Sequence, residues 1–461
     1  MNRLTPQRLS ILDASFLGME TRDTPMHVGA LQAFRLPPDA PPDFVKQVVK
    51  RYRTPGEMTP PWNLKLAAVP LARLLPAMIR TDDVDFHYHV RHSALPDPGG
   101  ERELGELISH LHSQLLDRTR PLWTCHVIEG LHGGRFAIYL KIHHALTDGV
   151  KGVRMVCGSL DAGPGDGLVP PWKMRKSGER SRSVSDERRP LKETAVPLQW
   201  PQVMLRAFRP LLRREAGAAA VLRPFEAPNS ALLNGRVTGT RRIATQQLSL
   251  DRVKRVAKQN GASLNDVFLA VCSAALRRHL LENDALPEKS LIAGVPMSLR
   301  VEGVEGGEDG GNAVGFLWAA LGTQIADPQR RLAAIHDSMN AWKNHLHSLP
   351  PRMRLVFTSL IFAPAVAVLT AGMGARVRPP MNIVISNVPG PDKPLYLGAA
   401  RMEAIYPVSI PIQGQALNIS CVSYAGKLNI GFTGSRDRLP HLQRIAVYAG
   451  AALAELERQD R

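Results

Sequence analysis

The chain has few cysteines and no hydrophobic leader, and both shortages narrow the class of protein. Four cysteines are scattered over 461 residues without a CxxC pair, which predicts neither a zinc ribbon nor a disulfide framework and favours a reducing compartment. The first residues, MNRLTPQRLSILDASF, contain no uninterrupted apolar run and no cleavage-like site. We therefore expect no secretory signal and place the protein in the cytoplasm.

Acidic residues are outnumbered by basic ones, and the formal net charge is +17. Such a surface attracts polyanions, which include nucleic acid, acidic lipid headgroups and phosphate-bearing substrates such as coenzyme A. We expect no nucleic-acid binding, because no helix-turn-helix, zinc-finger or RNP pattern accompanies the basic runs. With 44% hydrophobic and 21% charged residues, the chain is typical of a folded globular protein, and its length favours two domains.

A polar, basic stretch separates the two expected domains. Residues 161–234 include PPWKMRKSGERSRSVSDERRP, which is almost free of aliphatic side chains and predicts an exposed linker. The following WPQVMLRAFRPLLRREAGAAAVL predicts a basic amphipathic helix bent at Pro210. Two interpretations stay open for this helix: a solvated cover over the domain junction, or a helix whose arginines meet acidic lipid headgroups.

One uncharged run, residues 355–375, is long enough to span a bilayer. Pro364 and several small residues interrupt it. These interruptions leave three alternatives: a buried helix or hairpin, an element in the membrane interface, or a spanning helix.

On both sides of the linker, strand-like and helix-like segments alternate, which predicts an α/β fold. PLWTCHVIEGL and RFAIYLKI are separated by His132, Gly133 and Gly134 and predict a β-hairpin. In the second half, five further strands are expected: LIAGVPMSL, AVGFLWAAL, MNIVIS, ALNISCVSY and KLNIGFTG.

The sharpest local feature is RFAIYLKIHHALTDGVKGVRMV. Apolar residues alternate along its first part, so a strand is expected, with His144 continuing the parity of the buried face and His143 on the opposite face. Asp148 and Gly149 then form a turn before residues with helical spacing. The pattern predicts a strand, a histidine pair, a tight loop and a helix, with Asp148 also suited to be the helix N-cap.

Five segments, in order along nearly the whole chain, resemble the bacterial wax ester synthase/diacylglycerol acyltransferase family of the coenzyme A-dependent acyltransferase superfamily. They are LDASFLGMETRDTPMHVGALQAF, PLW at 121–123, HHALTDG at 143–149, SLND at 263–266 and ISNVPGP at 385–391. The resemblance implies two chloramphenicol-acetyltransferase-like domains, residues 1–160 and 235–461. Each would have a mixed β-sheet flanked by helices, with an active-site tunnel at their interface.

The same resemblance assigns catalytic roles in the HHxxxDG segment. His144 is expected to be the general base, Asp148 and Gly149 to fix the loop, and His143 to orient a substrate or support the structure. A neutral imidazole suits removal of the alcohol proton during attack on a thioester. The implied reaction transfers a long-chain acyl group from acyl-CoA to a fatty alcohol or diacylglycerol, with acyl-CoA as substrate and no cofactor. A covalent intermediate on Cys157 is the minority alternative.

The second domain is expected to contribute polar side chains to the active site. Asn265 lies in the first turn of a helix that begins after Ser263, and its amide is a candidate donor to the developing oxyanion or the acceptor hydroxyl. Asp266 is a candidate substrate contact, although Ser263 with Asp266 also fits a capping box. Asn387 begins a rigid turn that either is structural or lines the tunnel. Trp123 of PLW is expected in the core.

A histidine-rich segment and the basic surface suggest further sites and functions. FHYHVRH places His87 and His89 on one expected strand face with His92 near, but no acidic or cysteine partner follows at ligand spacing, so we expect no metal. The basic surface suits coenzyme A phosphates and an anionic inner-membrane face or lipid droplet. The rivals are a condensing acyltransferase with another acceptor or a carrier-protein donor, and a non-catalytic lipid-surface protein. Acceptor preference, acyl-chain length and oligomeric state do not follow from the pattern.

Overall fold

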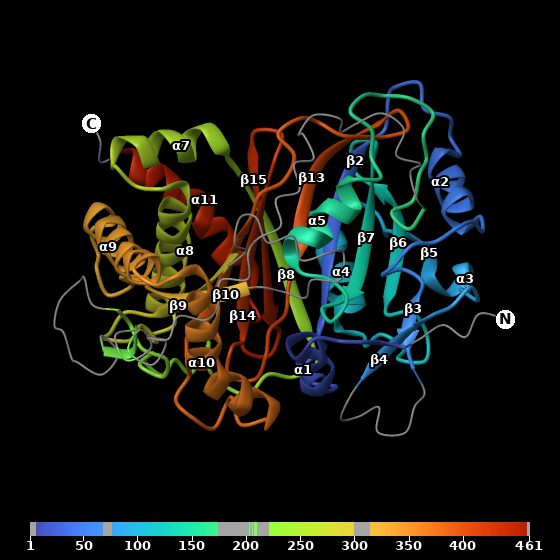
Figure 1. Ribbon diagram of the computed structural model, residues 1–461. Coiled ribbons are helices and arrows are strands. Elements are labelled where there is room, and N and C mark those ends of the chain that lie inside the picture. The colour runs from blue at the N-terminus through green and yellow to red at the C-terminus, as the bar shows by residue number, and fades with distance from the viewer. Residues whose placement is uncertain are drawn as a thin grey trace, which may run out of the picture.

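The computed structural model describes residues 6–67, 76–173, 202, 205, 207–209, 221–298 and 314–458. Two halves lie side by side, each built on a six-stranded sheet (Figure 1). A smaller sheet combines β1 (Gln7–Arg8), β4 (Ala77–Arg80) and β3 (Leu64–Leu66). The helices are α1 (Ile11–Met19), α2 (Phe44–Arg53), α3 (Phe86–His89), α4 (Glu101–Ser113), α5 (Gly149–Cys157), α7 (Leu250–Gln259), α8 (Leu264–Leu281), α9 (Pro328–His347), α10 (Pro351–Thr370) and α11 (Leu442–Arg458).

The sheet of the N-terminal half contains the predicted hairpin. Its strand order is β12 (Tyr396–Leu397), β13 (Ala400–Val408), β2 (His27–Arg35), β7 (Arg135–His143), β6 (Trp123–Leu131) and β5 (Val90–Ala94). The β6–β7 pair is antiparallel and turns at Gly133 and Gly134, both with positive φ, whereas β5 and β6 are parallel. The sheet is therefore mixed, as predicted. Both of its faces are covered, so β7 is buried along almost all its length.

The sheet of the C-terminal half contains the five strands predicted there. Its order is β10 (Val314–Ala320), β9 (Ile292–Ser298), β11 (Ile383–Val388), β14 (Leu417–Tyr424), β15 (Lys427–Ser435) and β8 (Arg241–Ser249). The parallel neighbours of β11 are β9 and β14, and the other pairs are antiparallel. Ala425 and Gly426, both with positive φ, join β14 to β15 in a two-residue turn.

The two halves are interlocked by strands and by a shared apolar layer. Residues 396–408, far along the chain, form β12 and β13 and pair with β2 of the N-terminal sheet. At the junction, Ile108 of α4, Tyr139 of β7 and Ile243 of β8 share one buried cluster. Two serines of α4 cap the backbone of edge strand β8: Ser109 Oγ accepts from Ile243 N at 3.0 Å, and Ser113 Oγ accepts from Arg241 N at 2.9 Å. The edge of this sheet is thereby closed.

The uncharged run after residue 355 forms α10 and the turn that follows it. Phe357 and Ile361, four residues apart, are buried against the core of the C-terminal half, and Ala365, four residues further on, is also buried. On the outer side, Val356 and Leu360 are 44% and 51% exposed. Among the described residues, no helix has the length and apolarity needed to cross a membrane. One side of α10 is buried, which agrees with the buried alternative for that side.

Candidate active site

The HHxxxDG segment forms the predicted strand, loop and helix. Strand β7 ends at His143, Leu146 N donates to His143 O at 3.0 Å within the loop, and α5 begins after Asp148. Asp148 Oδ1 accepts from Lys151 N at 2.7 Å, which is the N-cap contact predicted for this residue. The backbone of the pair is anchored on both sides, because His143 N donates to Leu122 O of the PLW motif and His144 N donates to Met26 O, each at 2.9 Å.

The imidazole of His144 is neutral and partly enclosed. Its ring stacks on Phe16 of α1, with centroids 4.1 Å apart and planes inclined by 18°. Burial, the largest influence, lowers the pKa of His144 to about 4, and the Asp148 charge acts in the opposite direction. Nδ1 is buried and has no hydrogen-bond partner within the described part of the chain. A neutral imidazole has one unprotonated ring nitrogen, so this side chain can accept a proton.

His143 lies on the opposite face, as its parity predicts, and is fully buried. Its Nδ1 accepts a hydrogen bond from Ala145 N at 3.1 Å. Its Nε2 lies 3.4 Å from Glu20 Oε1. These contacts join the His143 ring to the loop at Ala145 and to the N-terminal segment at Glu20, so they favour the structural role over direct contact with a substrate.

Glu20 and Phe16 are site residues that the motif patterns did not single out. Burial raises the pKa of the Glu20 carboxyl, but hydrogen bonding and charge from His143, with help from Met26 N and Arg118, outweigh it and hold the net pKa below its usual value. Both residues lie in LDASFLGMETRDTPMHVGALQAF, the first segment of the family resemblance. Their place in that segment was the available signal, whereas the burial of Glu20 becomes visible only in the fold.

The predicted turn after β11 meets the HHxxxDG loop across the junction of the halves. A Cβ placed on Gly149 would lie 3.3 Å from Val388 Cγ2, so α5 and β11 are in close contact there. Asn387 is partly buried beside Val388, and its Oδ1 accepts from Cys421 Sγ at 3.3 Å. The structure thus brings the ISNVPGP segment of the C-terminal half against Gly149.

Asn265 and Asp266 lie in the first turn of α8. Asp266 is fully buried and forms the predicted capping box, accepting from Ser263 N at 2.9 Å, while Asp266 N donates to Ser263 Oγ at 3.2 Å. His336 Nδ1 also lies 2.9 Å from Asp266 Oδ2. Asn265 is partly exposed. Helix α8 packs mainly on α11, α9 and α7, and it lies apart from α5 in Figure 1.

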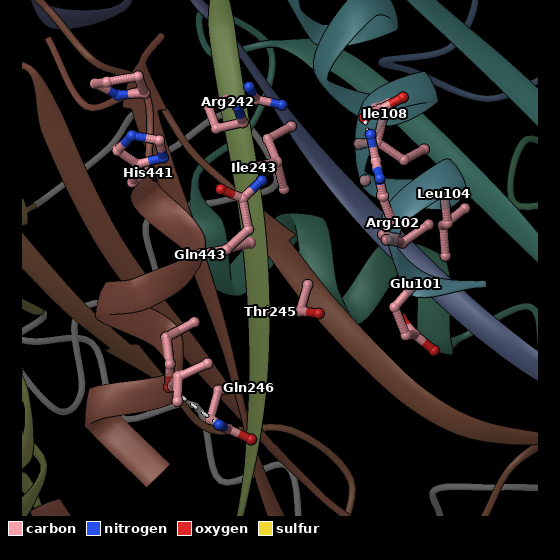
Figure 2. A pocket seen from close by; sticks show the side chains of 17 residues that line it. Glu101, Arg102, Leu104, Ile108, Arg242, Ile243, Thr245, Gln246, His441 and Gln443 are labelled. Carbon is pink, nitrogen blue, oxygen red and sulfur yellow. Dashed lines mark hydrogen bonds and ion pairs between the residues drawn. The ribbon is translucent and has the colours of Figure 1, made fainter. Parts of the chain in front are cut away.

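A cleft of about 510 Å³ lies between α4, β8 and α11 at the junction of the halves (Figure 2). Leu104, Ile108 and Ile243 give it an apolar floor. The acids on α4 are already paired: Glu101 with Arg135 at 3.1 Å, and Glu106 with Arg102 at 3.2 Å. No residue of the HHxxxDG segment lines this cleft, so it is separate from His144.

The histidines of FHYHVRH are not on one strand face, so that prediction is wrong. Asp85 caps the short helix α3, accepting from His87 N and Tyr88 N, and this turn takes His87 and His89 out of a strand. His89 Nδ1 contacts Trp123 O at 2.8 Å, and His92 pairs with Glu129. Trp123 is fully buried, as predicted. Across the described ranges, no cluster of histidine, cysteine or acidic residues could hold a metal ion.

Most of the predicted linker lies outside the described residues, including residues 174–201 and Pro210. Of the predicted amphipathic helix, Leu205 and Arg209 are exposed, Ala207 is buried, and the Phe208 ring contacts Phe357 of α10 at 5.2 Å between centroids. This part of the segment therefore packs on the C-terminal half.

Comparison with known proteins gives consistent matches over the whole chain. Residues 9–268 match the model of the wax ester synthase/diacylglycerol acyltransferase catalytic domain, and residues 310–457 match that of the WS/DGAT C-terminal domain. "Probable diacyglycerol O-acyltransferase tgs2" of Mycobacterium tuberculosis is 42% identical, covering 96% of this chain and 97% of that protein. "O-acyltransferase WSD" of Acinetobacter baylyi is 38% identical, covering 95% and 94%.

Solved structures agree with this result. The wax ester synthase/diacylglycerol acyltransferase from Marinobacter aquaeolei VT8 is 36% identical, covers 99% of both chains and superposes with a TM-score of 0.76. The first condensation domain of the CDA synthetase is 16% identical with a TM-score of 0.57, covering 98% of this chain and 97% of that chain. The second match concerns the fold alone, and it confirms the predicted chloramphenicol-acetyltransferase-like architecture of two α/β halves.

Proposed function

The chain belongs to the wax ester synthase/diacylglycerol acyltransferase family, and from this premise we propose that it transfers a long-chain acyl group from acyl-CoA to a fatty alcohol or to diacylglycerol. His144 is the general base. The observation that carries this proposal is the position of His144 on the loop between β7 and α5, with its ring stacked on Phe16.

The reaction proceeds by direct attack. His144 takes the acceptor's hydroxyl proton as the oxygen forms a bond to the thioester carbonyl carbon. The tetrahedral intermediate then collapses, the C–S bond breaks, and the imidazolium returns the proton to the leaving thiolate. A low pKa makes His144 a weak base but a strong acid once protonated, which suits this second step. Neutrality of the imidazole at all physiological pH values keeps the first step available.

A covalent intermediate on Cys157 is disfavoured by the surroundings of the thiol. Cys157 lies at the end of α5 and is buried. Burial raises the pKa of Cys157 to about 12. The thiolate, which is the nucleophilic form, is therefore scarce at neutral pH.

The other predicted residues take supporting roles in this proposal. Asp148 and Gly149 fix the loop at the start of α5, His143 supports the pair, and Asn387 lines the tunnel at the junction of the halves. Asn265, partly exposed in the first turn of α8, is the proposed donor to the oxyanion or the acceptor hydroxyl. Asp266 fixes the start of α8 through its capping box with Ser263 and directly follows Asn265 in the sequence.

The basic surface has two proposed uses: binding coenzyme A phosphates and holding the protein at an anionic membrane face or lipid droplet, where the acceptors are dissolved. The net charge of +17 supports both. Raised salt is expected to release the protein from phosphatidylglycerol vesicles, because screening weakens surface charge attraction. Vesicle binding that does not change with salt concentration would contradict the electrostatic part of this proposal.

The substrates are tested with purified protein. Palmitoyl-CoA is supplied with hexadecanol in one reaction and with diacylglycerol in another, and ester products are quantified by chromatography and mass spectrometry. Ester formation in either reaction supports the proposal, and the ratio identifies the preferred acceptor. If a palmitoyl carrier protein gives product while palmitoyl-CoA gives none, the donor is wrong. Folded protein that forms no ester from any donor would refute the catalytic function.

A further inference from the structure

Glu20 is a buried carboxylate that follows α1 in an extended conformation, and its side chain is only 3% exposed. Oε2 accepts from Arg118 Nε at 3.0 Å and lies 2.9 Å from Arg118 Nη2. Oε1 accepts from Met26 N at 3.1 Å and lies 3.4 Å from His143 Nε2. A buried charge is tolerated when it is paired in this way. The arginine therefore neutralises one oxygen and leaves the other for the catalytic segment.

The contact between Ala145 N and the His143 ring fixes which nitrogen of that ring has the proton. Nδ1 accepts from Ala145 N at 3.1 Å, so in a neutral ring the proton must be on Nε2. Within the described ranges Nε2 has no hydrogen-bond partner of good geometry, and Glu20 Oε1 lies 3.4 Å from it, at an ion-pair distance. Glu20 and Ala145 thus hold the ring of His143 from both ends.

The same carboxylate oxygen also reaches His144 through the backbone. Met26 N donates to Glu20 Oε1, and Met26 O accepts from His144 N at 2.9 Å. The His144 ring also stacks on Phe16, which lies on α1 four residues before Glu20. A shift of Glu20 would therefore move a contact of His143 and a contact of His144 together.

We propose that Glu20 is the positioning residue of the histidine pair: through His143 Nε2 and Met26 N, its carboxylate sets the position of His144 relative to the substrates. This inference rests on the proposed function, in which His144 is the general base. Glu20 is 3.4 Å from His143 and reaches His144 only through Met26, so it acts through other groups and does not touch the reacting atoms. A misplacement of about 1 Å at a reacting group can cost roughly 10²-fold in rate.

The kinetic test compares Glu20→Ala, Glu20→Gln and Asp23→Ala. Asp23 is an acid three residues away that pairs with Arg236 at the surface, at 3.4 Å, so Asp23→Ala is the matched control. Glu20→Ala is expected to lower kcat by about 10²-fold with KM changed less than about 3-fold. Glu20→Gln keeps an oxygen acceptor and is expected to be intermediate, and Asp23→Ala to match the wild type.

A second readout does not depend on catalysis. With 15N-labelled histidine, the His143 Nε2–H proton should give a slowly exchanging imidazole resonance, assigned by its loss in His143→Asn. We expect Glu20→Ala to lose this resonance and Asp23→Ala to keep it. A Glu20→Ala enzyme with wild-type kcat overturns the proposal, as does one that loses kcat while keeping the resonance. If Glu20→Ala does not fold, Glu20→Gln decides, and wild-type values for both readouts overturn the proposal.

The two proposals fail in different ways. If His144→Ala keeps full ester formation, the proposed base is wrong, yet the His143 resonance still reports whether Glu20 holds the pair. If His144→Ala is inactive and Glu20→Ala is normal in both readouts, the base stands and the positioning role is wrong.

Discussion

At the scale of single residues, the sequence motif located the histidine pair and its loop, and parity along β7 separated the two rings correctly. The motif did not reveal what holds the rings. Phe16 and Glu20 reach the pair from more than 120 residues away in the sequence, and no local periodicity reports such a contact. A buried acid becomes recognisable as a support only when the fold brings His143, Met26 and Arg118 around it.

The low pKa of His144 predicts an unusual pH profile. Because the base must be neutral, activity is lost as pH falls through its pKa, and this pKa is about 4. We expect kcat/KM for ester formation to stay level from pH 8 to about 5.5 and to fall only below that. The measurement uses short assays with intrinsic fluorescence as a check on folding. A midpoint near 6.5 in folded enzyme would contradict the buried position of this ring.

Asp148 is predicted to matter for both stability and activity. Asp148→Ala removes the N-cap of α5 and should cost ~1 kcal/mol of unfolding free energy, together with a loss of kcat because the loop moves. Asp327→Ala is the matched control, since Asp327 Oδ1 caps α9 by accepting from Arg330 N at 2.8 Å.

Urea unfolding and ester assays are compared for the two cap variants. We expect similar losses of stability and a loss of kcat for Asp148→Ala alone. Equal kcat in both variants would show that the α5 cap has no special connection with the active site.

At the scale of elements, strands and hairpins followed from alternation and turn residues, but two segments did not follow from pattern alone. The α3 turn interrupts a stretch that alternates like a strand, because Asp85 supplies a cap. The uncharged run 355–375 is long enough to span a bilayer, yet Phe357 and Ile361 pack on the core of the C-terminal half. In both cases partners from elsewhere in the fold decide the structure, and a local pattern contains no information about them.

The packing of α5 on β11 gives an element-level prediction. A Cβ on Gly149 would already lie 3.3 Å from Val388 Cγ2. The larger side chain of Gly149→Val would therefore collide with Val388 and should push α5 and β11 apart. Gly152→Ala is the control on the same helix, because its Cβ would meet Thr147 atoms only at an ordinary 3.6 Å.

Kinetics and thermal unfolding distinguish the two substitutions. Gly149→Val is expected to lower kcat at least 10-fold, and Gly152→Ala to leave kcat unchanged with equal or higher stability. Wild-type kcat in Gly149→Val would mean that contact between α5 and β11 is not needed for the reaction.

At the scale of the whole molecule, two α/β halves were predictable from alternating elements and from the basic stretch between them. The exchange of β12 and β13 into the N-terminal sheet was not. Residues 396–408 were not among the expected strands, and sheet membership is a long-range property that strand propensity does not encode. This exchange brings Asn387 and Gly149 to the same junction and makes the two halves one unit.

Buried histidines predict acid sensitivity of the whole fold. Burial lowers the pKa of His89 to about 4 and those of His112 and His126 to about 3. Above the unfolded pKa near 6.5 both states are neutral, whereas below it only the unfolded state takes up protons. Stability is therefore lost as pH falls from about 6.5 toward 4, by ~2 kcal/mol per histidine at pH 5.

Urea unfolding measured between pH 7.5 and pH 5 checks this expectation. His126→Phe should lower the pH slope of the unfolding free energy by about one proton, because one proton-binding group is removed from the unfolded state. An unchanged slope in a folded variant would show that His126 is already protonated in the native state.

The central claim is that His144 is the base for acyl transfer, and the most direct measurement is acceptor-dependent release of coenzyme A thiol from palmitoyl-CoA. Wild type, His144→Ala and His110→Ala are compared with the preferred acceptor; His110 is an exposed histidine on α4 and serves as the control. We expect His144→Ala to lose at least 10²-fold in kcat with an unchanged circular dichroism spectrum, and His110→Ala to have the wild-type kcat. Release by His144→Ala at the wild-type rate would contradict the central claim.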